Sequence, residues 1–293
     1  MRPLSIAALQ VSPVARDPAA TLRLLGEGVA AVRDVSPSVK LVMFPELHLP
    51  GLPPPLELHG HARDLAVDVP GPLTDELAAI ARAHGVWLVP GSVYERGDGK
   101  RVHNTALVFS PDGELVARYR KVFPWQPHET SDPGDAFVTF DIPEVGRIGL
   151  SICYDGSFPE TCRQLAWMGA ELVLQPSLTT TSDRDQEIVM ARANAIFNQL
   201  YVVSLNAGTP AGLGRSLIVD PEGLVRIQAG DGEEVLTDVL DLDAVTRVRE
   251  YGTAGVSRLW DQARRSLQPP FALAEDAVRP PEPAPDPTTA EPT

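Results

Sequence analysis

Segments typical of strands and segments typical of helices alternate along most of this chain. Short apolar runs such as Val39–Phe44 and Tyr201–Leu205 have the length and composition of buried strands. Longer stretches such as Ala19–Val32 and Asp185–Gln199 place apolar residues at helical spacing. The run SPDG at 110–113 is a strong turn between two further strands. The alternation predicts an α/β fold in which a mixed sheet, or two sheets, are covered by helices.

Composition restricts the class of protein and its partners. With 293 residues, 43% of them hydrophobic, the chain can form one large domain with a sizeable core. A formal net charge of −14 disfavours nucleic acids and anionic membrane surfaces as partners. Two cysteines do not make a disulfide framework, which indicates a reducing compartment. The apolar stretch Leu4–Val11 lacks the charge and cleavage site of a signal peptide, and no segment approaches the ~20 apolar residues of a membrane span. We therefore expect a cytoplasmic protein.

The composition changes near the C-terminus. From about Arg279 the chain reads PPEPAPDPTTAEPT, which is rich in proline, acidic and without aromatic residues. Such a segment cannot bury enough apolar surface to fold by itself. We expect a single domain over residues 1–278 and a disordered tail over residues 279–293.

The stretch 147–160 (RIGLSICYDGSFPE) combines a strand, a tight turn and the start of a helix around Cys153. The run SFPE at 157–160 matches a capping box with proline early in the helix. A cysteine between a strand end and a helix start is held rigidly, near backbone N–H groups that favour a thiolate. This is a position for a nucleophile, and the alternative is a small buried cysteine that closes a strand. We expect Cys162, about one turn into the helix, to be structural.

Two charged residues also follow predicted strands. Glu46 comes directly after VKLVMFP, and Lys121 comes directly after LVARYR. Sites in α/β proteins gather at strand ends. A carboxylate can remove the thiol proton of Cys153, and an ammonium can stabilise the negative charge that develops when the thiolate attacks a carbonyl or nitrile carbon. Taken singly, each charge could also belong to an ordinary solvated surface.

Three segments together resemble the nitrilase superfamily of carbon–nitrogen hydrolases. They are FPELHLPG at 44–51, YRKVFPWQPHE at 119–129 and ICYDGSFPE at 152–160. The resemblance extends from the first predicted strand to about Asp241. It implies a four-layer α-β-β-α sandwich with a C-terminal extension, which pairs through its helical face into homodimers or larger assemblies.

In that superfamily a Glu-Lys-Cys triad occupies these three contexts. The resemblance therefore implies Glu46 as general base, Lys121 as stabiliser of the tetrahedral intermediate and Cys153 as nucleophile. The second glutamate of the family matches Glu129, which is implied to orient the lysine and the substrate. The resemblance also implies an oxyanion hole made by Lys121 and the backbone N–H of Tyr154.

The residues after the cysteine distinguish classes within the superfamily. Nitrilases usually have Trp-Glu there, whereas this chain has Tyr154-Asp155, and Gly156-Ser157 lack the arginines of carbamoylases. The lysine and cysteine segments are most similar to those of aliphatic amidases and formamidases. The resemblance thus implies hydrolysis of a primary, aliphatic carboxamide to a carboxylic acid and ammonia through a thioester.

Other loops differ from the aliphatic amidases, at 130–132 and at 175–179. These loops are expected to line the mouth of the pocket, so an amide larger than formamide or acetamide is a reasonable substrate. We expect Trp125, Tyr154 and Ser177 to contact the substrate, with an ordinary core aromatic as the alternative for Trp125.

Several alternatives remain at this point. Hydrolysis of N-carbamoyl compounds or nitriles uses the same triad, and a non-catalytic binding protein could be built on the same fold. The pair His59-Gly60-His61 could ligate a metal, but no matching carboxylate or cysteine spacing accompanies it. There is no glycine-rich phosphate loop or nucleotide fingerprint, so we expect no metal and no cofactor.

Overall fold

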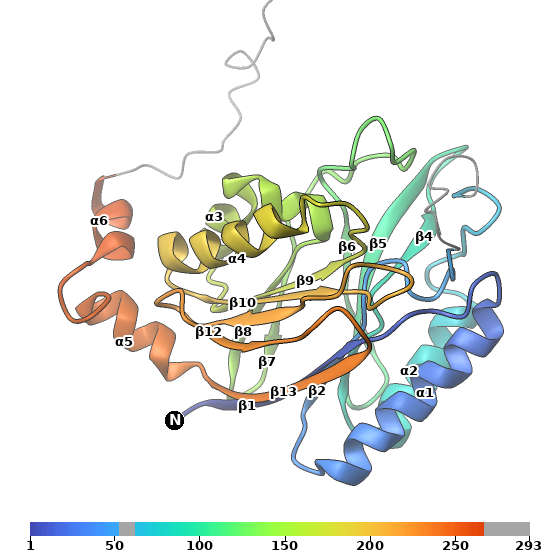
Figure 1. The fold of residues 1–293 in the computed structure, drawn as a ribbon, viewed down its shortest axis with the longest axis horizontal. Coiled ribbons are helices and arrows are strands. Elements are labelled where there is room, and N and C mark those ends of the chain that lie inside the picture. Colours follow the sequence, from blue (N-terminus) through green and yellow to red (C-terminus); the bar gives the residue numbers. More distant parts are fainter. Residues whose placement is uncertain (53–61, 267–293) are drawn as a thin grey trace, which may run out of the picture.

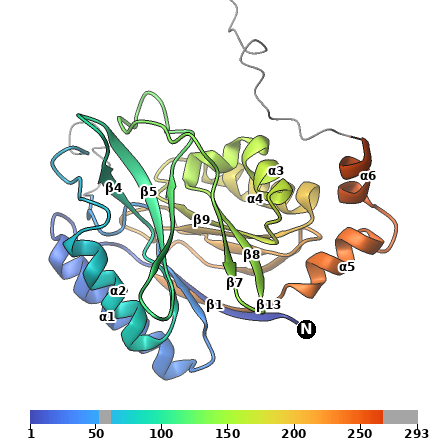
Figure 2. The same ribbon diagram turned by 180° about the vertical axis from the view of Figure 1, so that it is seen from behind.

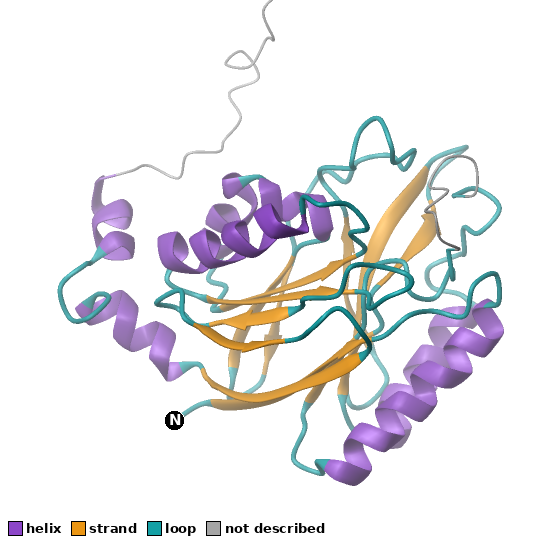
Figure 3. Ribbon diagram, viewed as in Figure 1, coloured by secondary structure: helices purple, strands orange, loops and turns teal. Residues whose placement is uncertain are grey.

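The computed structural model describes residues 1–52 and 62–266. Within these ranges the strands form two sheets, one of seven and one of six strands, packed face to face with helices on both outer sides (Figure 1, Figure 3). Figure 2 shows the same layers from behind, with α1 and α2 on one side and α3 and α4 on the other. The expected α/β four-layer α-β-β-α sandwich is confirmed.

The first sheet joins the beginning of the chain to its last described strand. Its order is β13 (Glu234–Asp241), β1 (Pro3–Gln10), β2 (Leu41–Met43), β3 (Trp87–Val89), β5 (Val102–Phe109) and β4 (Ser92–Arg96), and β6 (Leu115–Arg120) also pairs with β5. Strands β1, β2 and β3 are parallel, whereas β13 pairs antiparallel with β1. The carboxyl end of β2 therefore lies at the same edge as that of β3.

The second sheet has a parallel centre. Its order is β12 (Val225–Gln228), β11 (Leu217–Val219), β10 (Tyr201–Asn206), β9 (Leu172–Ser177), β8 (Gly146–Leu150) and β7 (Thr139–Ile142). Strands β8, β9 and β10 run in the same direction, so their carboxyl ends meet at one edge. The segment that contains Cys153 leaves the sheet at this edge.

Helices α1 (Pro18–Val35) and α2 (Pro72–His84) cover the first sheet. The side chain of Asp17 caps α1 by accepting a hydrogen bond from the N–H of Ala20. Apolar residues at helical spacing form its buried stripe, namely Leu25, Val29 and Val32. This stripe packs on the outer face of the sheet and contributes to one of the two outer cores.

Helices α3 (Pro159–Trp167) and α4 (Arg184–Asn198) cover the second sheet. Cys162 is only 1% exposed within α3, which agrees with a structural role. Two short helices follow, α5 (Asp243–Tyr251) and α6 (Leu259–Ser266). Trp260 of α6 lies 5.1 Å from the ring of Trp167, and the guanidinium of Arg249 lies 4.6 Å from the Trp260 ring. The C-terminal extension is thus attached to the α3–α4 layer.

The central core lies between the two sheets. Ile6 and Met43 of the first sheet and Ile148 and Leu174 of the second are fully buried in one apolar cluster. Because this cluster joins the sheets, it fixes the edges of the two sheets relative to each other.

The sequence of residues 86–94 predicts a single strand, and the structure corrects this prediction. The segment forms two strands, β3 and β4, separated at Pro90-Gly91. Gly91 has φ 84°, and a Cβ atom there would lie 1.7 Å from the carbonyl oxygen of Pro45. Only glycine allows the chain to cross so close to the segment that carries Glu46.

The predicted capping box at 157–160 is also wrong in part. The helix N-cap is Phe158 without a side-chain hydrogen bond, and Pro159 is the first helical residue. Residues Cys153–Ser157 form a short 3-10 helix, η1, because the side chain of Asp155 accepts a hydrogen bond from the N–H of Ile152 and closes the turn. Four elements were not predicted at all, namely β7, β13, α5 and α6.

Within the described ranges, no helix has both the length and the apolar character needed to cross a membrane. The same ranges contain no group of three or more metal-binding side chains. The pair His59-Gly60-His61, the expected domain boundary after residue 278 and the segment 279–293 all lie outside the described residues.

Candidate active site

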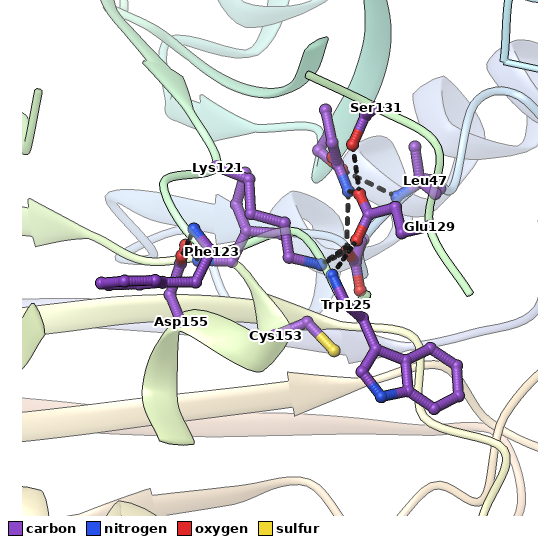
Figure 4. Close-up of polar contacts among 12 residues, drawn as sticks. Leu47, Lys121, Phe123, Trp125, Glu129, Ser131, Cys153 and Asp155 are labelled. Carbon is purple, nitrogen blue, oxygen red and sulfur yellow. Dashed lines mark hydrogen bonds and ion pairs between the residues drawn. The ribbon is translucent and has the colours of Figure 1, made fainter. Parts of the chain in front are cut away.

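The three residues predicted from strand ends meet at one place between the two sheets. Glu46 follows β2, Lys121 follows β6 and Cys153 follows β8. Figure 4 shows Lys121, Glu129 and Cys153 directed toward a common space beside Trp125. The sandwich therefore brings the ends of two strands of one sheet against the end of a strand of the other.

Lys121 is bound between two glutamates. Its Nζ lies 2.9 Å from Glu46 Oε1 and 2.7 Å from Glu129 Oε2, and all three side chains are at most 4% exposed. Buried charges at these distances interact strongly, since little water screens them. The ammonium is thus held in one position before any substrate arrives.

Further donors fix the two carboxylates. Asn104 Nδ2 donates to Glu46 Oε1 at 2.8 Å and to Glu129 Oε1 at 2.9 Å. Glu129 also accepts from the N–H of Trp125 and the hydroxyl of Ser131, at 3.0 and 2.8 Å. Asn104 therefore connects both glutamates from the middle of β5, a strand that is otherwise mostly apolar.

Cys153 sits in a strained turn. Its φ is 47°, which is unfavourable for a residue with a side chain and is typical of functional sites. Gln175 Nε2 donates to the carbonyl of Cys153 at 2.8 Å, and Gln175 packs against Gly156 where a Cβ atom would lie 2.1 Å away. Close packing at Gly156 thus holds the backbone of the cysteine.

Asp155 connects this turn to the segment of Lys121. It accepts from the N–H of Phe123 at 2.8 Å and from the hydroxyl of Tyr119 at 2.8 Å, in addition to the N–H of Ile152. Its burial raises the pKa of its carboxyl to about 6. The turn with the thiol and the segment with the ammonium are therefore held together by one side chain.

The pKa shifts within the site distinguish a base, Glu46, from a fixed cation, Lys121. Burial raises the pKa of Glu46, and the nearby Lys121 charge only partly opposes this. Burial acts to lower the pKa of Lys121, but the charges of Glu129 and Glu46 outweigh it and hold the pKa well above its usual value. Burial acts to raise the pKa of Glu129, but Lys121 outweighs it and lowers the pKa. Glu46 is the carboxylate that accepts a proton more readily.

The expectation of a thiolate at Cys153 is not met. Burial, and after it the charge of Glu46, raise the pKa of the Cys153 thiol well above its usual value, although Lys121 partly opposes this. The Cys153 thiol in turn lowers the pKa of Glu46, by less than Lys121 does. At neutral pH the resting nucleophile is a thiol beside a base rather than a preformed thiolate.

A small pocket opens next to the sulfur. It is lined by Trp125, Cys153, Tyr154, Leu178, Thr179, Thr180, Thr181, Asp183 and Glu187. Trp125 and Tyr154 therefore lie where a substrate would contact them. Ser177 is fully buried, its hydroxyl has no hydrogen-bond partner among the described residues, and it is not one of the residues named above. The lining begins one residue later, at Leu178.

The sequence matches a family of known proteins. Residues 5–250 match the carbon–nitrogen hydrolase family. The chain is a carbon–nitrogen hydrolase. The mouse omega-amidase NIT2 is 34% identical over 204 residues, which cover 64% of this chain and 73% of the relative. Human omega-amidase NIT2 is 33% identical over the same shares of the two chains.

Solved structures place this carbon–nitrogen hydrolase in the nitrilase superfamily. Nit3 of Saccharomyces cerevisiae, a member of branch 10 of that superfamily, superposes with a TM-score of 0.77 at 27% identity, over 85% of this chain and 94% of the other. An amidase from Nesterenkonia sp. superposes with a TM-score of 0.72 at 25% identity, over 84% of this chain and 94% of the other. The resemblance drawn from the sequence is thereby confirmed.

The sequence did not reveal every residue that builds this carbon–nitrogen hydrolase site. The role of Asn104 was missed, although a buried amide in an apolar strand is a signal that it has polar partners. Thr179 belongs to the loop 175–179 that was expected to line the mouth of the pocket, whereas Glu187 was missed as a pocket residue. Thr179 Oγ1 lies 3.8 Å from Cys153 Sγ and donates to the Glu187 carboxylate, at 2.7 and 2.9 Å from its two oxygens. These contacts depend on how α4 is placed on the second sheet.

Proposed function

We propose that this chain is a cysteine-dependent amidase that hydrolyses a primary, aliphatic carboxamide to a carboxylic acid and ammonia. The observation that carries the proposal is the buried Lys121 ammonium, bound by Glu46 and Glu129 beside the Cys153 thiol. A thiol, a base with a raised pKa and a fixed cation are the groups that acyl transfer needs.

The first half of the reaction forms a thioester. Glu46 removes the thiol proton while the sulfur of Cys153 attacks the amide carbon, and the carbonyl electron pair moves onto oxygen. The resulting oxyanion is stabilised by Lys121 and by the backbone N–H of Tyr154. Glu46 then gives its proton to the amide nitrogen, the carbon–nitrogen bond breaks and ammonia leaves.

The second half restores the enzyme. Glu46, again a carboxylate, takes a proton from a water molecule that attacks the thioester carbon. The same two donors stabilise the second oxyanion. The carbon–sulfur bond breaks, the carboxylic acid leaves and the sulfur recovers its proton from Glu46. Glu129 stays bound to Lys121 through both halves and acts as a positioning residue.

Two observations support an amide as the substrate. The omega-amidase relatives and the Nesterenkonia amidase are named for this activity. The pocket beside Cys153 has one aromatic wall at Trp125 and another at Tyr154, which suit an aliphatic acyl chain. Ser177, buried behind this lining, would support the pocket wall rather than contact the substrate.

The test is release of ammonia from a series of short primary amides by the wild-type protein and by Cys153→Ala. We expect wild-type turnover and none with the variant, whose fold should be unchanged by circular dichroism. Mass spectrometry of the wild type, quenched during turnover, should show an acyl group on Cys153. Equal ammonia release by the variant would show the assignment of the nucleophile to be wrong.

Carbamoyl compounds and nitriles serve as the contrasting substrates in the same assay. A nitrilase would release ammonia faster from a nitrile than from the matching amide. An N-carbamoyl hydrolase would prefer a carbamoyl amino acid, whose carboxylate requires a cationic partner in the pocket. Either preference would replace the amidase proposal.

A further inference from the structure

One wall of the pocket is polar and acidic. It is formed by the segment that follows β9 and by the first turns of α4. Thr179, Thr180 and Thr181 contribute hydroxyls, while Asp183 and Glu187 contribute carboxylates. Among the described residues that line the pocket, two are acidic and none is basic.

Glu187 retains room for one more donor. Its Oε2 accepts from Arg184 Nη1 at 2.8 Å, whereas its Oε1 has Thr179 Oγ1 as its only hydrogen-bond partner among the described residues. The Thr179 hydroxyl has a single proton and lies 2.7 and 2.9 Å from the two carboxylate oxygens, so it can donate fully to only one of them. A carboxylate accepts up to about four hydrogen bonds, and Glu187 is therefore incompletely satisfied.

The Thr179 hydroxyl is held rigidly beside the nucleophile. The N–H of Thr179 donates to Asn206 Oδ1 at 2.8 Å, and Asn206 Nδ2 donates back to the carbonyl of Thr179 at 3.1 Å. Its hydroxyl lies 3.8 Å from Cys153 Sγ. Only the Thr179 hydroxyl lies between the Glu187 carboxylate and the sulfur of Cys153. A short acyl chain bound to the sulfur can therefore reach this carboxylate.

The basic residue nearest to this wall already donates hydrogen bonds to other groups of the protein. Arg184 is fully buried and donates to the carbonyls of Gly214 and Arg215 and to the hydroxyl of Ser204, in addition to Glu187. The Lys121 ammonium is likewise already paired, with Glu46 and Glu129. Neither cation is free to bind a carboxylate on the acyl chain of a substrate.

We infer that the pocket selects an amide whose acyl chain carries an ammonium group, and that Glu187 is the residue that binds it. The inference rests on the proposed amidase function and adds the charge of the substrate to it. An ammonium would complete the hydrogen bonds of Glu187 and meet the second negative charge at Asp183. A carboxylate in the same place would face two like charges, with no cation among the described lining residues, which disfavours it.

Three amides of similar size test the charge preference. They are 4-aminobutanamide, which is cationic, pentanamide, which is its neutral isostere, and succinamate, which is anionic. Binding is measured by calorimetry on the full chain carrying Cys153→Ala, so that no turnover is needed. We expect 4-aminobutanamide to bind about tenfold or more tightly than pentanamide, and succinamate to bind most weakly.

Two further variants, each combined with Cys153→Ala, assign the preference to a residue. Glu187→Gln removes the charge but keeps one acceptor oxygen for Arg184 and places an NH2 group that can donate to the Thr179 hydroxyl. It should reduce the ratio of the affinities for 4-aminobutanamide and pentanamide to near one. Asp185→Asn removes an equal charge from the same turn of α4. Asp185 is 71% exposed, pairs with Arg215 and does not line the pocket, so this control should keep the ratio.

The outcomes separate this inference from the proposed function. Equal affinity for the three amides, tighter binding of succinamate, no binding of any amide, or a ratio that survives Glu187→Gln would overturn the inference. Ammonia release is then measured with Cys153 intact. A clear charge preference without ammonia release would overturn the amidase proposal alone, whereas equal turnover of all three amides would overturn only the charge selection.

Discussion

Lys121 is the residue on which the described geometry depends most. Two buried carboxylates, Glu46 and Glu129, donate no hydrogen bonds of their own and need its ammonium between them. The same ammonium is the cation nearest to the developing oxyanion in the proposed reaction. Stability and catalysis are therefore coupled at this position.

Replacing Lys121 by Ala should damage both properties. The unpaired carboxylates should lower the free energy of unfolding by about 3–5 kcal/mol, measured by urea denaturation. The kcat/KM for a good amide should fall by roughly 100-fold or more, because the oxyanion loses its cation. Lys40→Ala is the matched control, since Lys40 is exposed. Wild-type stability in the Lys121 variant would contradict the burial argument.

The pH dependence of turnover should reflect Glu46 rather than the thiol. Burial raises the pKa of Glu46 above its usual 4.5, and Glu46 must be ionised to act as base. Activity should therefore be lost as the pH falls through a midpoint above 4.5. Because burial also raises the pKa of Cys153, thiolate formation should not contribute a rise near neutral pH.

The measurement is kcat/KM against pH for one amide, together with the rate of alkylation of Cys153 by iodoacetamide. Glu46→Gln should abolish turnover and make alkylation slow at neutral pH. An activity that keeps rising up to pH 9 would instead point to a thiolate-limited enzyme.

At the scale of elements, the turn η1 is positioned by contacts with both sheets in addition to its own hydrogen bonds. Gln175 of β9 lies against Gly156 and donates to the carbonyl of Cys153. Asp155 binds the same turn to the segment after β6. The second sheet and the hairpin of the first sheet thus both determine where the sulfur lies.

Gly156→Ala tests this packing. The new Cβ atom would lie 2.1 Å from Gln175 Nε2, so Gln175 must move away from Cys153. We expect a loss of about 1–3 kcal/mol in the free energy of unfolding and a drop in kcat at a smaller change in KM. Gly232→Ala is the control, because a Cβ atom there meets nothing within 4 Å. Equal behaviour of the two variants would show that the turn is not held by this contact.

The separation of the site residues along the chain explains which of them the sequence could predict and which it could not. Glu46, Lys121 and Cys153 follow apolar runs, so the ends of β2, β6 and β8 could be recognised locally. The partners of Asn104 are 58 and 25 residues away, so no local pattern specifies them. The strand β13 was missed because only Leu236 and Leu240 are buried in it, which leaves a weak apolar pattern.

Glu187 could not be predicted as a pocket residue for a related reason. Its place depends on the rotation of α4 about its axis on the second sheet. Helical spacing predicted the buried Ala191 and Ala195 of this helix, but not which polar residue of its first turns would face Cys153. The sequence thus predicted the residues around the nucleophile, but it did not predict the polar wall of the pocket.

At the scale of the whole molecule, the outer face of α4 carries an apolar stripe. Val189 is 65% exposed and Phe197 is 54% exposed, and Ala193 lies between them at helical spacing. We propose that the chain forms homodimers or larger assemblies through this helical layer, as the resemblance to the nitrilase superfamily implies. We also propose that residues 1–278 form one domain.

Light scattering after size exclusion tests the assembly. The wild type should have at least twice the mass of one chain, and Phe197→Ser combined with Val189→Glu should shift it toward the monomer. Val35→Ser is the control, since Val35 is 84% exposed at the end of α1 in the opposite layer. A monomeric wild type would refute the proposal.

The pairing of β1 with β13 has a consequence for how the protein is made. Pro3 lies opposite Asp241, and Gln10 lies opposite Glu234. While the chain is being synthesised, one edge of β1 stays without its partner until residues beyond 241 have left the ribosome. Contacts between such distant segments form slowly, and an open strand edge favours association with other chains. The residues of the site are all synthesised by Glu187, yet the sheet that supports Glu46 is completed only by a strand made some fifty residues later. Newly made chains should therefore gain activity only once β13 has paired with β1, and the open edge of β1 should favour aggregation until then.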